Sequence, residues 1–319
     1  SQIKYKSDRI TNCPSFCDGQ FHLARKLDYN SGMTSISLGQ LKTHRTRTFN
    51  LPPSKRLSSS AQASAFVNRR GFIFFWPISG IDLPSLWTAV AGDRPVADAH
   101  DAPGHITWGW KDGALGKKVW YYAKILRKKG TMVSLQVVPY FYALSENYGT
   151  PEEDYLTIYE QGRLTLEEKL VYEALLDNGP LDTIALRKAA HMTSRESESR
   201  FNRALTELQA GFKIVPVGVT ESGAWHYAFA YDIATRPYPE LIEQSRYIGE
   251  LDARQKIAEV YLLSLGAAQL RDLTRLFGWS TAEAQQALDR LEKTGLIQQN
   301  LALENQSGAF VGLSVLISN

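Results

Sequence analysis

The stretch "STAEAQQALDRLEKTG", residues 280–295, carries the start and stop signals of one complete helix. Ser280 and Glu283 have the spacing of a capping box, in which each side chain bonds the backbone N–H of the other residue. Gly295 stands where glycine commonly ends a helix. Two β-rich runs, residues 296–303 and 309–317, follow around the turn-forming "ENQSG". The segment therefore predicts a capped helix that leads into a β-hairpin.

The same order of elements occurs twice in this half of the chain. Ala204-Leu205 and Ala287-Leu288 hold equivalent places, 83 residues apart. The first copy is expected to contain three helices and two strands. The helices cover 164–179, a segment from or near Pro180 to 192, and 193–211 with a Thr193 to Glu196 capping box, and the strands cover 212–219 and 225–232. The second copy is expected to contain helices over 251–266, 267–279 and 280–295, followed by the second hairpin. Helix, helix, capped helix and hairpin is the winged-helix plan.

Residues 56–150 are expected to form a third, more decorated module of this kind. "SSSAQASAFVNRRG" predicts a helix, "FIFFWPI" a strand or buried run, and "DLPSLWTAVAG" a short helix begun by Pro84. "KVWYYAKILRKKGTMVSLQVV" predicts a hairpin around a basic turn. The sequence thus predicts an α+β fold of three tandem winged-helix modules. The expected boundaries are a basic, disordered tail over 1–55 and modules over 56–150, 151–245 and 246–319.

Charge is distributed unevenly along the 319 residues, whose total is +3. Residues 1–60 carry a net +7, residues 61–150 a net +4, and residues 151–319 a net −8. A basic front half is typical of a protein that grips a polyanion from one side. No run approaches the roughly 20 apolar residues of a membrane span, so we expect a cytoplasmic protein with no membrane partner.

The N-terminal segment raises two further alternatives. Cys13, Cys17 and His22 are three potential zinc ligands, but a structural zinc site takes four, so we expect reduced thiols and no metal. The first methionine is Met33, and residues 1–32 are either working protein or an over-extended reading frame.

Three stretches resemble the tandem winged-helix proteins that include the AlkZ/YcaQ-type DNA glycosylases, enzymes that unhook interstrand crosslinks and remove alkylated bases. The stretches are "RRGFIFFWPISGIDLPSLWTAV", "RKKGTMVSLQVVPYFYAL" and "EVYLLSLGAAQLRDLTRLFGW". The likeness covers most of the chain after about residue 56 and is nearest to a diverged, AlkZ-related branch. It implies three winged-helix units around a positively charged concavity that holds double-stranded DNA. We expect no cofactor.

The resemblance also implies where the family's catalytic Gln-x-Gln or Gln-x-Asp motif falls. By eye, Phe74, Phe75 and Trp76 occupy that place, and a phenyl ring neither accepts a proton nor orients water. The catalytic residues are therefore unknown, and a glycosylase and a non-catalytic sensor of damaged DNA both stay open. The rings have two interpretations, a stacking platform for an unpaired base or core packing, and we favour core packing.

Two groups of residues are predicted to contact DNA. One is the basic turn of the first module, whose cations suit phosphate contact. The other is the outward face expected for helix 193–211 once Phe201, Leu205 and Leu208 turn inward. These DNA-binding candidates are Lys124, Arg127, Lys128 and Lys129 in the turn and Arg195, Ser199, Asn202 and Arg203 on the helix.

"WGWKDG", residues 108–113, offers a different chemistry. Lys111 would be an amine nucleophile for an abasic sugar if burial among rings lowered its pKa. Adjacent residues on a strand point to opposite faces, which argues against a Lys111-Asp112 partnership, so two packing tryptophans and a surface ion pair are the favoured interpretation.

The sequence holds no phosphate-binding glycine loop, G-x-S-x-G or H-E-x-x-H motif, which disfavours a nucleotide cofactor, a serine hydrolase and a metalloenzyme. The leading hypothesis is a nucleoid-associated protein that acts on or senses damaged duplex DNA. The alternatives are a winged-helix transcriptional regulator, which would dimerise and read two half-sites, and a non-catalytic scaffold.

Overall fold

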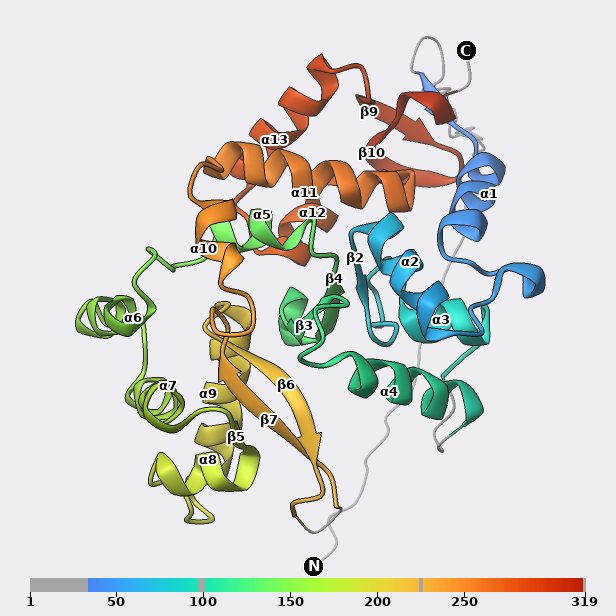
Figure 1. Cartoon of the computed structure of the whole chain (residues 1–319). Coiled ribbons are helices and arrows are strands. Elements are labelled where there is room, and N and C mark those ends of the chain that lie inside the picture. The colour runs from blue at the N-terminus through green and yellow to red at the C-terminus, as the bar shows by residue number, and fades with distance from the viewer. Residues whose placement is uncertain (1–33, 97–100, 224–225, 318–319) are drawn as a thin grey trace, which may run out of the picture. The chain divides into compact units, whose positions relative to one another are not determined.

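The computed structural model describes residues 34–96, 101–223 and 226–317, all within the compact unit Thr34–Asn319. This part of the chain has an α+β fold with three small sheets (Figure 1). Cys13, Cys17 and His22, and the question of residues 1–32, lie outside the described residues.

The last segment has the predicted order of helices and hairpin. Its elements are α11 (Glu250–Leu265), β8 (Ala267–Ala268), α12 (Leu270–Phe277), α13 (Thr281–Lys293), β9 (Ile297–Leu303) and β10 (Gln306–Leu313). The Ser280 capping box is confirmed: Ser280 Oγ accepts a hydrogen bond from the Glu283 backbone N–H, and the Glu283 carboxylate accepts one from the Ser280 N–H.

The preceding segment repeats the plan, with boundaries that differ from the prediction. Its elements are α6 (Pro151–Glu160), α7 (Leu166–Asn178), β5 (Leu181–Asp182), α8 (Thr183–Ala189), α9 (Glu198–Ala210), β6 (Ile214–Thr220) and β7 (Ala228–Ile233). The predicted Thr193 to Glu196 capping box is wrong, because α9 begins only after Ser197. The Ser197 hydroxyl lies 2.8 Å from the Met192 carbonyl and 2.7 Å from the Ser194 carbonyl, which holds residues 194–197 in a turn instead.

The first segment contains the predicted helix, strand, short helix and hairpin, and two α-helices, over 102–114 and 138–143, that were not predicted. Its elements are η1 (Pro53–Lys55), α2 (Ser60–Arg70), β2 (Phe72–Phe74), α3 (Leu86–Ala91), α4 (Ala102–Ala114), β3 (Tyr121–Lys124), η2 (Leu126–Lys128), β4 (Gly130–Val133) and α5 (Val138–Ala143). Residues 108–113 lie in α4 rather than on a strand. Asp101 caps this helix by accepting a hydrogen bond from the Gly104 N–H at 2.8 Å, and Thr107 and Lys111 form its buried face.

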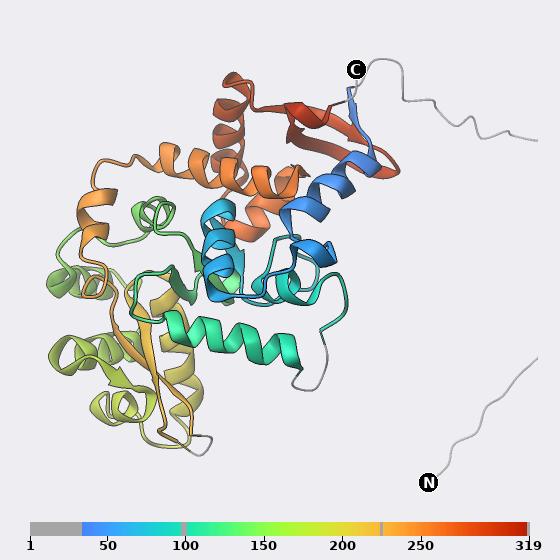
Figure 2. The same cartoon turned by 45° about the vertical axis from the view of Figure 1, so that its right-hand side comes forward.

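Residues 34–55 are not the disordered tail that the sequence suggested. β1 (Ser35–Ile36) pairs in parallel with β9, and α1 (Leu38–Thr48) packs against α11. Arg45 donates hydrogen bonds to the carbonyls of Leu265 and Ala267 at 3.0 and 3.1 Å. The last carbonyls of a helix have no partner within the helix, so α1 satisfies groups that α11 leaves open. Figure 2 shows α1 lying beside the C-terminal elements.

The strand orders place one sheet in each segment. They are β2-β4-β3 in the first segment, β5-β7-β6 in the second, and β1-β9-β10-β8 in the third. The number of winged-helix modules and their boundaries stay predictions.

A single hydrophobic cluster crosses the expected boundaries between segments. Tyr121 of β3 packs on Phe212 and Tyr238, with ring centroids 5.2 and 5.1 Å apart, and the same cluster includes Phe72 and Ile257. The segments therefore share buried apolar area in addition to clusters of their own, and this shared area packs the hairpin β3-β4 against α9 and α12.

Candidate nucleic-acid interface

The basic turn between β3 and β4 is a rigid, exposed tip. Its backbone is fastened by hydrogen bonds from Leu126 N–H to Thr131 Oγ1 at 3.2 Å and from Lys129 N–H to the Leu126 carbonyl at 3.0 Å. Leu126 is buried, whereas Arg127, Lys128 and Lys129 are exposed. Arg127 and Lys128 adopt φ values of 53° and 57°, a left-handed conformation that costs about 1 to 2 kcal/mol per residue. Such strain is often found at functional sites.

The tip lies directly against the C-terminal part of α9, and Glu207 links it to Arg203 of the predicted DNA-binding face. The Lys124 backbone N–H donates to Gln209 Oε1 at 3.2 Å, and Lys124 Nζ lies 3.4 Å from Thr206 Oγ1. Lys128 Nζ pairs with the Glu207 carboxylate at 2.5 Å. In the free protein the Glu207 carboxylate is therefore paired with Lys128, one of the cations of the tip.

The outer face of α9 is exposed as predicted, with one exception. Phe201, Leu205 and Leu208 are buried, and Ser199, Asn202 and Arg203 face outward. Arg203 is 78% exposed, and its Nε lies 4.0 Å from the Glu207 carboxylate. Arg195 is exposed but lies in the turn before α9 rather than on the helix. The contact of these residues with DNA stays a prediction.

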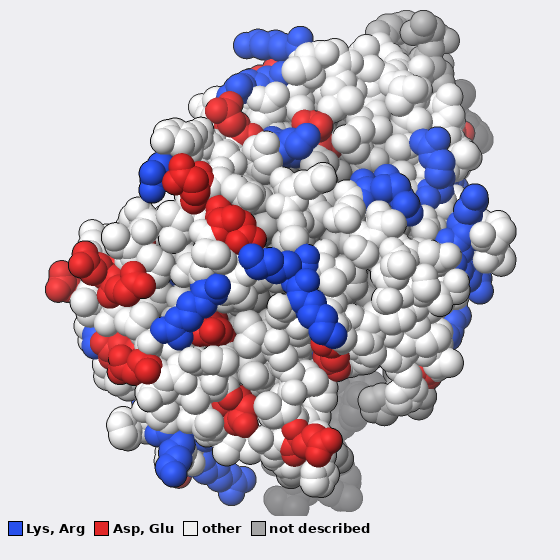
Figure 3. Space-filling view, viewed as in Figure 1, with Lys and Arg blue, Asp and Glu red and all other residues white. Residues whose placement is uncertain are grey.

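Charge on the face shown in Figure 3 is mixed, with Lys and Arg side chains next to Asp and Glu side chains. The ion pairs Lys128–Glu207, Arg163–Glu146 and Arg254–Glu283 are of this kind. If a polyanion binds here, its phosphates replace these carboxylates as the partners of the Lys and Arg side chains.

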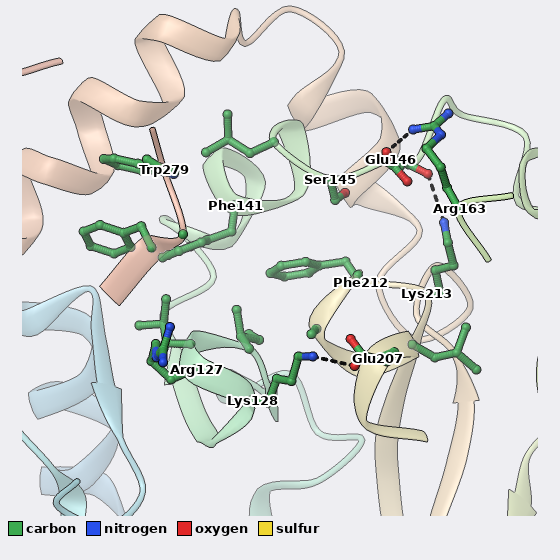
Figure 4. A pocket seen from close by; sticks show the side chains of 18 of the residues that line it. Arg127, Lys128, Phe141, Ser145, Glu146, Arg163, Glu207, Phe212, Lys213 and Trp279 are labelled. Carbon is green, nitrogen blue, oxygen red and sulfur yellow. Dashed lines mark hydrogen bonds and ion pairs between the residues drawn. The ribbon is translucent and has the colours of Figure 1, made fainter. Parts of the chain in front are cut away.

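A cavity of about 600 Å³ opens beside the tip, where the three segments meet. Aromatic rings of Phe141, Phe212, Phe277 and Trp279 line it, and Trp279 stacks on Phe277 with centroids 4.5 Å apart. Figure 4 shows Phe141 and Phe212 pointing toward its centre, with charged side chains around it. This combination of rings and paired charges suits a planar, polar guest.

Lys213 lies in the wall of this cavity and was not singled out from the sequence. It is 6% exposed, and burial lowers its pKa to about 8. Its Nζ donates to the Glu146 carbonyl at 2.9 Å and to Asn147 Oδ1 at 3.1 Å. No sequence signal could have found it, because these acceptors lie more than 60 positions away along the chain.

The residues assigned to the family motif form part of the core. Phe74 is 0% exposed and Phe75 is 8% exposed, while Trp76 is half-buried and stacks on Phe75. Phe74 therefore offers no surface on which a base can stack, in agreement with the core interpretation.

A buried amine lies next to Phe75. Lys111 of α4 is 0% exposed, and its Nζ donates to Asp112 Oδ1 at 2.6 Å and to the Tyr227 hydroxyl at 2.9 Å. The argument against a Lys111-Asp112 partnership was wrong, because the two residues lie on a helix, where neighbours are separated by about 100° rather than 180°. Tyr227 closes the triangle by donating to Asp112 Oδ1 at 3.0 Å.

Five rings surround the Lys111 ammonium. The ring centroids lie 4.0 Å from Nζ for Trp108, 4.3 Å for Phe229, and 5.4 to 5.6 Å for the other three. The other three rings are those of Phe75, Tyr122 and Tyr227. Burial lowers the Lys111 pKa to about 8, although the neighbouring Asp112 carboxylate opposes the shift. We call Lys111, Asp112, Tyr227 and these rings the Lys111 cluster.

Two classes of site are not found in the described part of the chain. It holds no group of three or more His, Cys, Asp or Glu side chains arranged to bind a metal ion. None of its helices is long and apolar enough to cross a membrane.

Comparisons with known proteins agree with this fold. The DNA glycosylase AlkZ of Streptomyces sahachiroi matches with a TM-score of 0.55 at 12% identity, covering 88% of this chain and 71% of that one. No curated protein matches. Residues 57–278 match the family described as AlkZ related. That match spans well over half of the sequence, from α2 to the end of α12, and the chain belongs to the AlkZ-related family.

Proposed function

We propose that this protein binds double-stranded DNA and acts on or senses damaged duplexes. The observation that carries the proposal is the contact of the tip with α9, in which Lys124 and Lys128 bond Thr206, Glu207 and Gln209. The same helix exposes Ser199, Asn202 and Arg203. The family and the fold likeness to a DNA glycosylase support it. Such a role implies a nucleoid-associated protein of the cytoplasm.

The geometry favours contact with the phosphate backbone over reading of bases. A short, strained turn fits along or into a groove, and cations fixed at its tip neutralise phosphates without regard to sequence. Asn202 and Ser199 supply hydrogen-bonding groups beside them. The protein therefore holds duplex DNA with little sequence preference.

The cavity beside the tip gives the preference for damage. Damaged and mismatched bases leave the stack at a lower cost than paired bases, and aromatic side chains stabilise a base that has left it. Trp279 and Phe277 present stacked rings within the cavity. DNA binding at the tip does not depend on Phe74, Phe75 and Trp76. The rings of these three residues carry no group that activates water for catalysis.

Salt-dependent binding tests the proposal. Fluorescence anisotropy with a 20-base-pair duplex, measured between 50 and 300 mM salt, is expected to give weakening affinity as salt rises, because each phosphate contact adds about 0.9 to the log-log slope. Lys128→Ala and Lys129→Ala each lower that slope by about 0.9. Lys256→Ala, which removes a cation paired with Glu259 on α11, is the matched control and leaves it unchanged.

Three other outcomes contradict the proposal. Absence of binding at 50 mM salt leaves the scaffold alternative. Dimeric binding to a palindromic sequence identifies a transcriptional regulator. Equal affinity for intact duplexes and for duplexes with an alkylated base or an interstrand crosslink removes the damage-sensing part.

A further inference from the structure

We propose that Lys111 is an amine nucleophile that forms a Schiff base with the sugar aldehyde of an abasic site in DNA. The inference rests on the proposed DNA binding and adds a covalent reaction to it. It places chemistry in the Lys111 cluster, beside the position where the family resemblance sets its polar motif.

The surroundings of the amine suit nucleophilic attack. Lys111 Nζ is fully buried, and Asp112 is the one carboxylate within hydrogen-bond distance among the described residues. Its pKa of about 8 leaves about a tenth of the amine neutral at pH 7, against less than about a thousandth for an exposed lysine. Since only the neutral amine attacks a carbonyl carbon, burial raises the reactive fraction about 200-fold.

Asp112 and Tyr227 are placed to move the protons of the reaction. Asp112 Oδ1 accepts from both Lys111 Nζ and the Tyr227 hydroxyl. The neutral amine attacks the C1′ aldehyde carbon, and the proton released by nitrogen passes to Asp112. The alkoxide oxygen takes that proton and becomes the carbinolamine hydroxyl. Asp112 then takes the second N–H proton and passes it to this hydroxyl, which leaves as water, so a C=N bond replaces the C=O bond.

The imine then opens a route to strand cleavage. Once protonated, it withdraws electrons from C2′, and Asp112 takes the C2′ proton. The C3′–O bond breaks, and the 3′ phosphate leaves with its electron pair. Water hydrolyses the imine, which returns the Lys111 amine and releases an unsaturated aldehyde.

The amine lies one side chain below the surface. Tyr227, which is 37% exposed, and the Asp112 side chain, which is 20% exposed, form the outer wall of the cluster. Tyr227 directly precedes β7, whose hairpin lies beside α4 in Figures 1 and 2. An aldehyde that reaches Nζ from this side therefore has to displace the Tyr227 side chain.

The cluster is also close to the proposed DNA grip. Tyr122, whose ring lies 5.4 Å from Lys111 Nζ, and Lys124 are two residues apart on β3 and share its less buried face. Their Cα atoms are separated by about 7 Å in a strand. A sugar next to a phosphate held by Lys124 is thus within reach of the cluster.

Borohydride trapping tests the inference on the full chain. The protein is incubated with a duplex that carries one abasic site, reduced with sodium borohydride, and separated on a denaturing gel, and the adduct is located by peptide mass spectrometry. We expect an adduct on Lys111 that forms faster as pH rises from 6.5 to 8.5. Lys111→Met and Lys111→Arg reduce its formation at pH 7 by about 100-fold or more, because arginine keeps the charge but is not deprotonated.

Parallel measurements separate the possible failures. Binding to the intact duplex, measured by anisotropy, reports on the proposed function alone, and Lys256→Ala is the control for general loss of lysine. An abasic duplex that binds but gives no adduct, or an adduct on Lys213 or tip lysines in place of Lys111, overturns the inference. Mapping the wild-type adduct makes the result independent of whether the Lys111 variants fold.

Discussion

Replacing Glu207 by glutamine is expected to tighten DNA binding. In the free protein the Glu207 carboxylate holds Lys128 Nζ at 2.5 Å and lies 4.0 Å from Arg203 Nε. Both cations are proposed to face phosphates, so Glu207 competes with DNA for them. The substitution keeps the size of the side chain and removes that competition.

The size of the effect follows from the exposure of the pair. The Lys128 and Glu207 side chains are 55% and 28% exposed, and pairs of this kind contribute about 0.2 to 1 kcal/mol. The contact with Arg203, at 4.0 Å, adds little. Release of about 0.2 to 1 kcal/mol lowers Kd by about 1.4-fold to fivefold, since 1.4 kcal/mol corresponds to a factor of ten. The salt slope is expected to stay about the same, because Lys128 contacts a phosphate in both proteins.

Anisotropy titrations of wild type, Glu207→Gln, Lys128→Ala and the double variant measure this as a cycle. In the Lys128→Ala background the gain from Glu207→Gln falls, because the cation that it releases is missing. Glu243→Gln, which makes the same charge change in an exposed pair on α10 (Glu240–Ser245), is the control. Weaker binding by Glu207→Gln, or an equal gain from Glu243→Gln, would refute local competition at the tip.

Three further predictions concern the cavity, the core and pH. Trp279→Ala is expected to weaken binding to a duplex with an unpaired base by about 1 to 3 kcal/mol and to leave intact-duplex binding unchanged, because only stacking is lost. Phe74→Ala is expected to lower the free energy of unfolding in urea by about 3 to 5 kcal/mol, and a cost near zero would contradict its burial. The Lys111 pKa of about 8 lies below the unfolded value of about 10.4, so between these pH values the unfolded chain binds more protons and stability rises with pH. From pH 8 to 9.5 the free energy of unfolding is expected to rise by about 1 to 2 kcal/mol, and the groups that face the amine are Asp112, Tyr122 and Tyr227. Urea titrations of Lys111→Met are expected to show no such rise. The same rise in Lys111→Met as in the wild type would mean that the amine is not buried.

The sequence predicted correctly those elements whose ends are determined by hydrogen bonds between residues a few positions apart. The Ser280 to Glu283 box and Gly295 bound α13 correctly because the partners of the capping hydrogen bonds are three positions apart. Thr193 and Glu196 show the same spacing but lie before the helix, since Ser197 bonds back to Met192 and Ser194. A matching spacing therefore locates a helix start only when no local turn competes for the same groups.

Elements and sites that depend on distant partners were not predicted. Glycines at 104, 109 and 113 weaken the helical signal of α4, whereas burial of Thr107 and Lys111 against distant residues stabilises it. The sequence did suggest Lys111 as an amine that needs a ring-lined setting. Tyr227 and Phe229, which supply much of that setting, lie more than 115 positions away and carry no sequence mark of the contact.

The pairing of β1 with β9 bears on how the chain folds during synthesis. Ser35 is opposite Ala302, so the first described strand emerges from the ribosome long before its partner exists. Until then β1 has an unpaired edge. α1 in turn lacks the Leu265 carbonyl that Arg45 bonds until α11 has been made. The N-terminal elements therefore dock only after most of the protein has been translated. A ribosome-stalled chain that ends before α11 is expected to leave residues 34–48 open to proteolysis, while a released chain protects them.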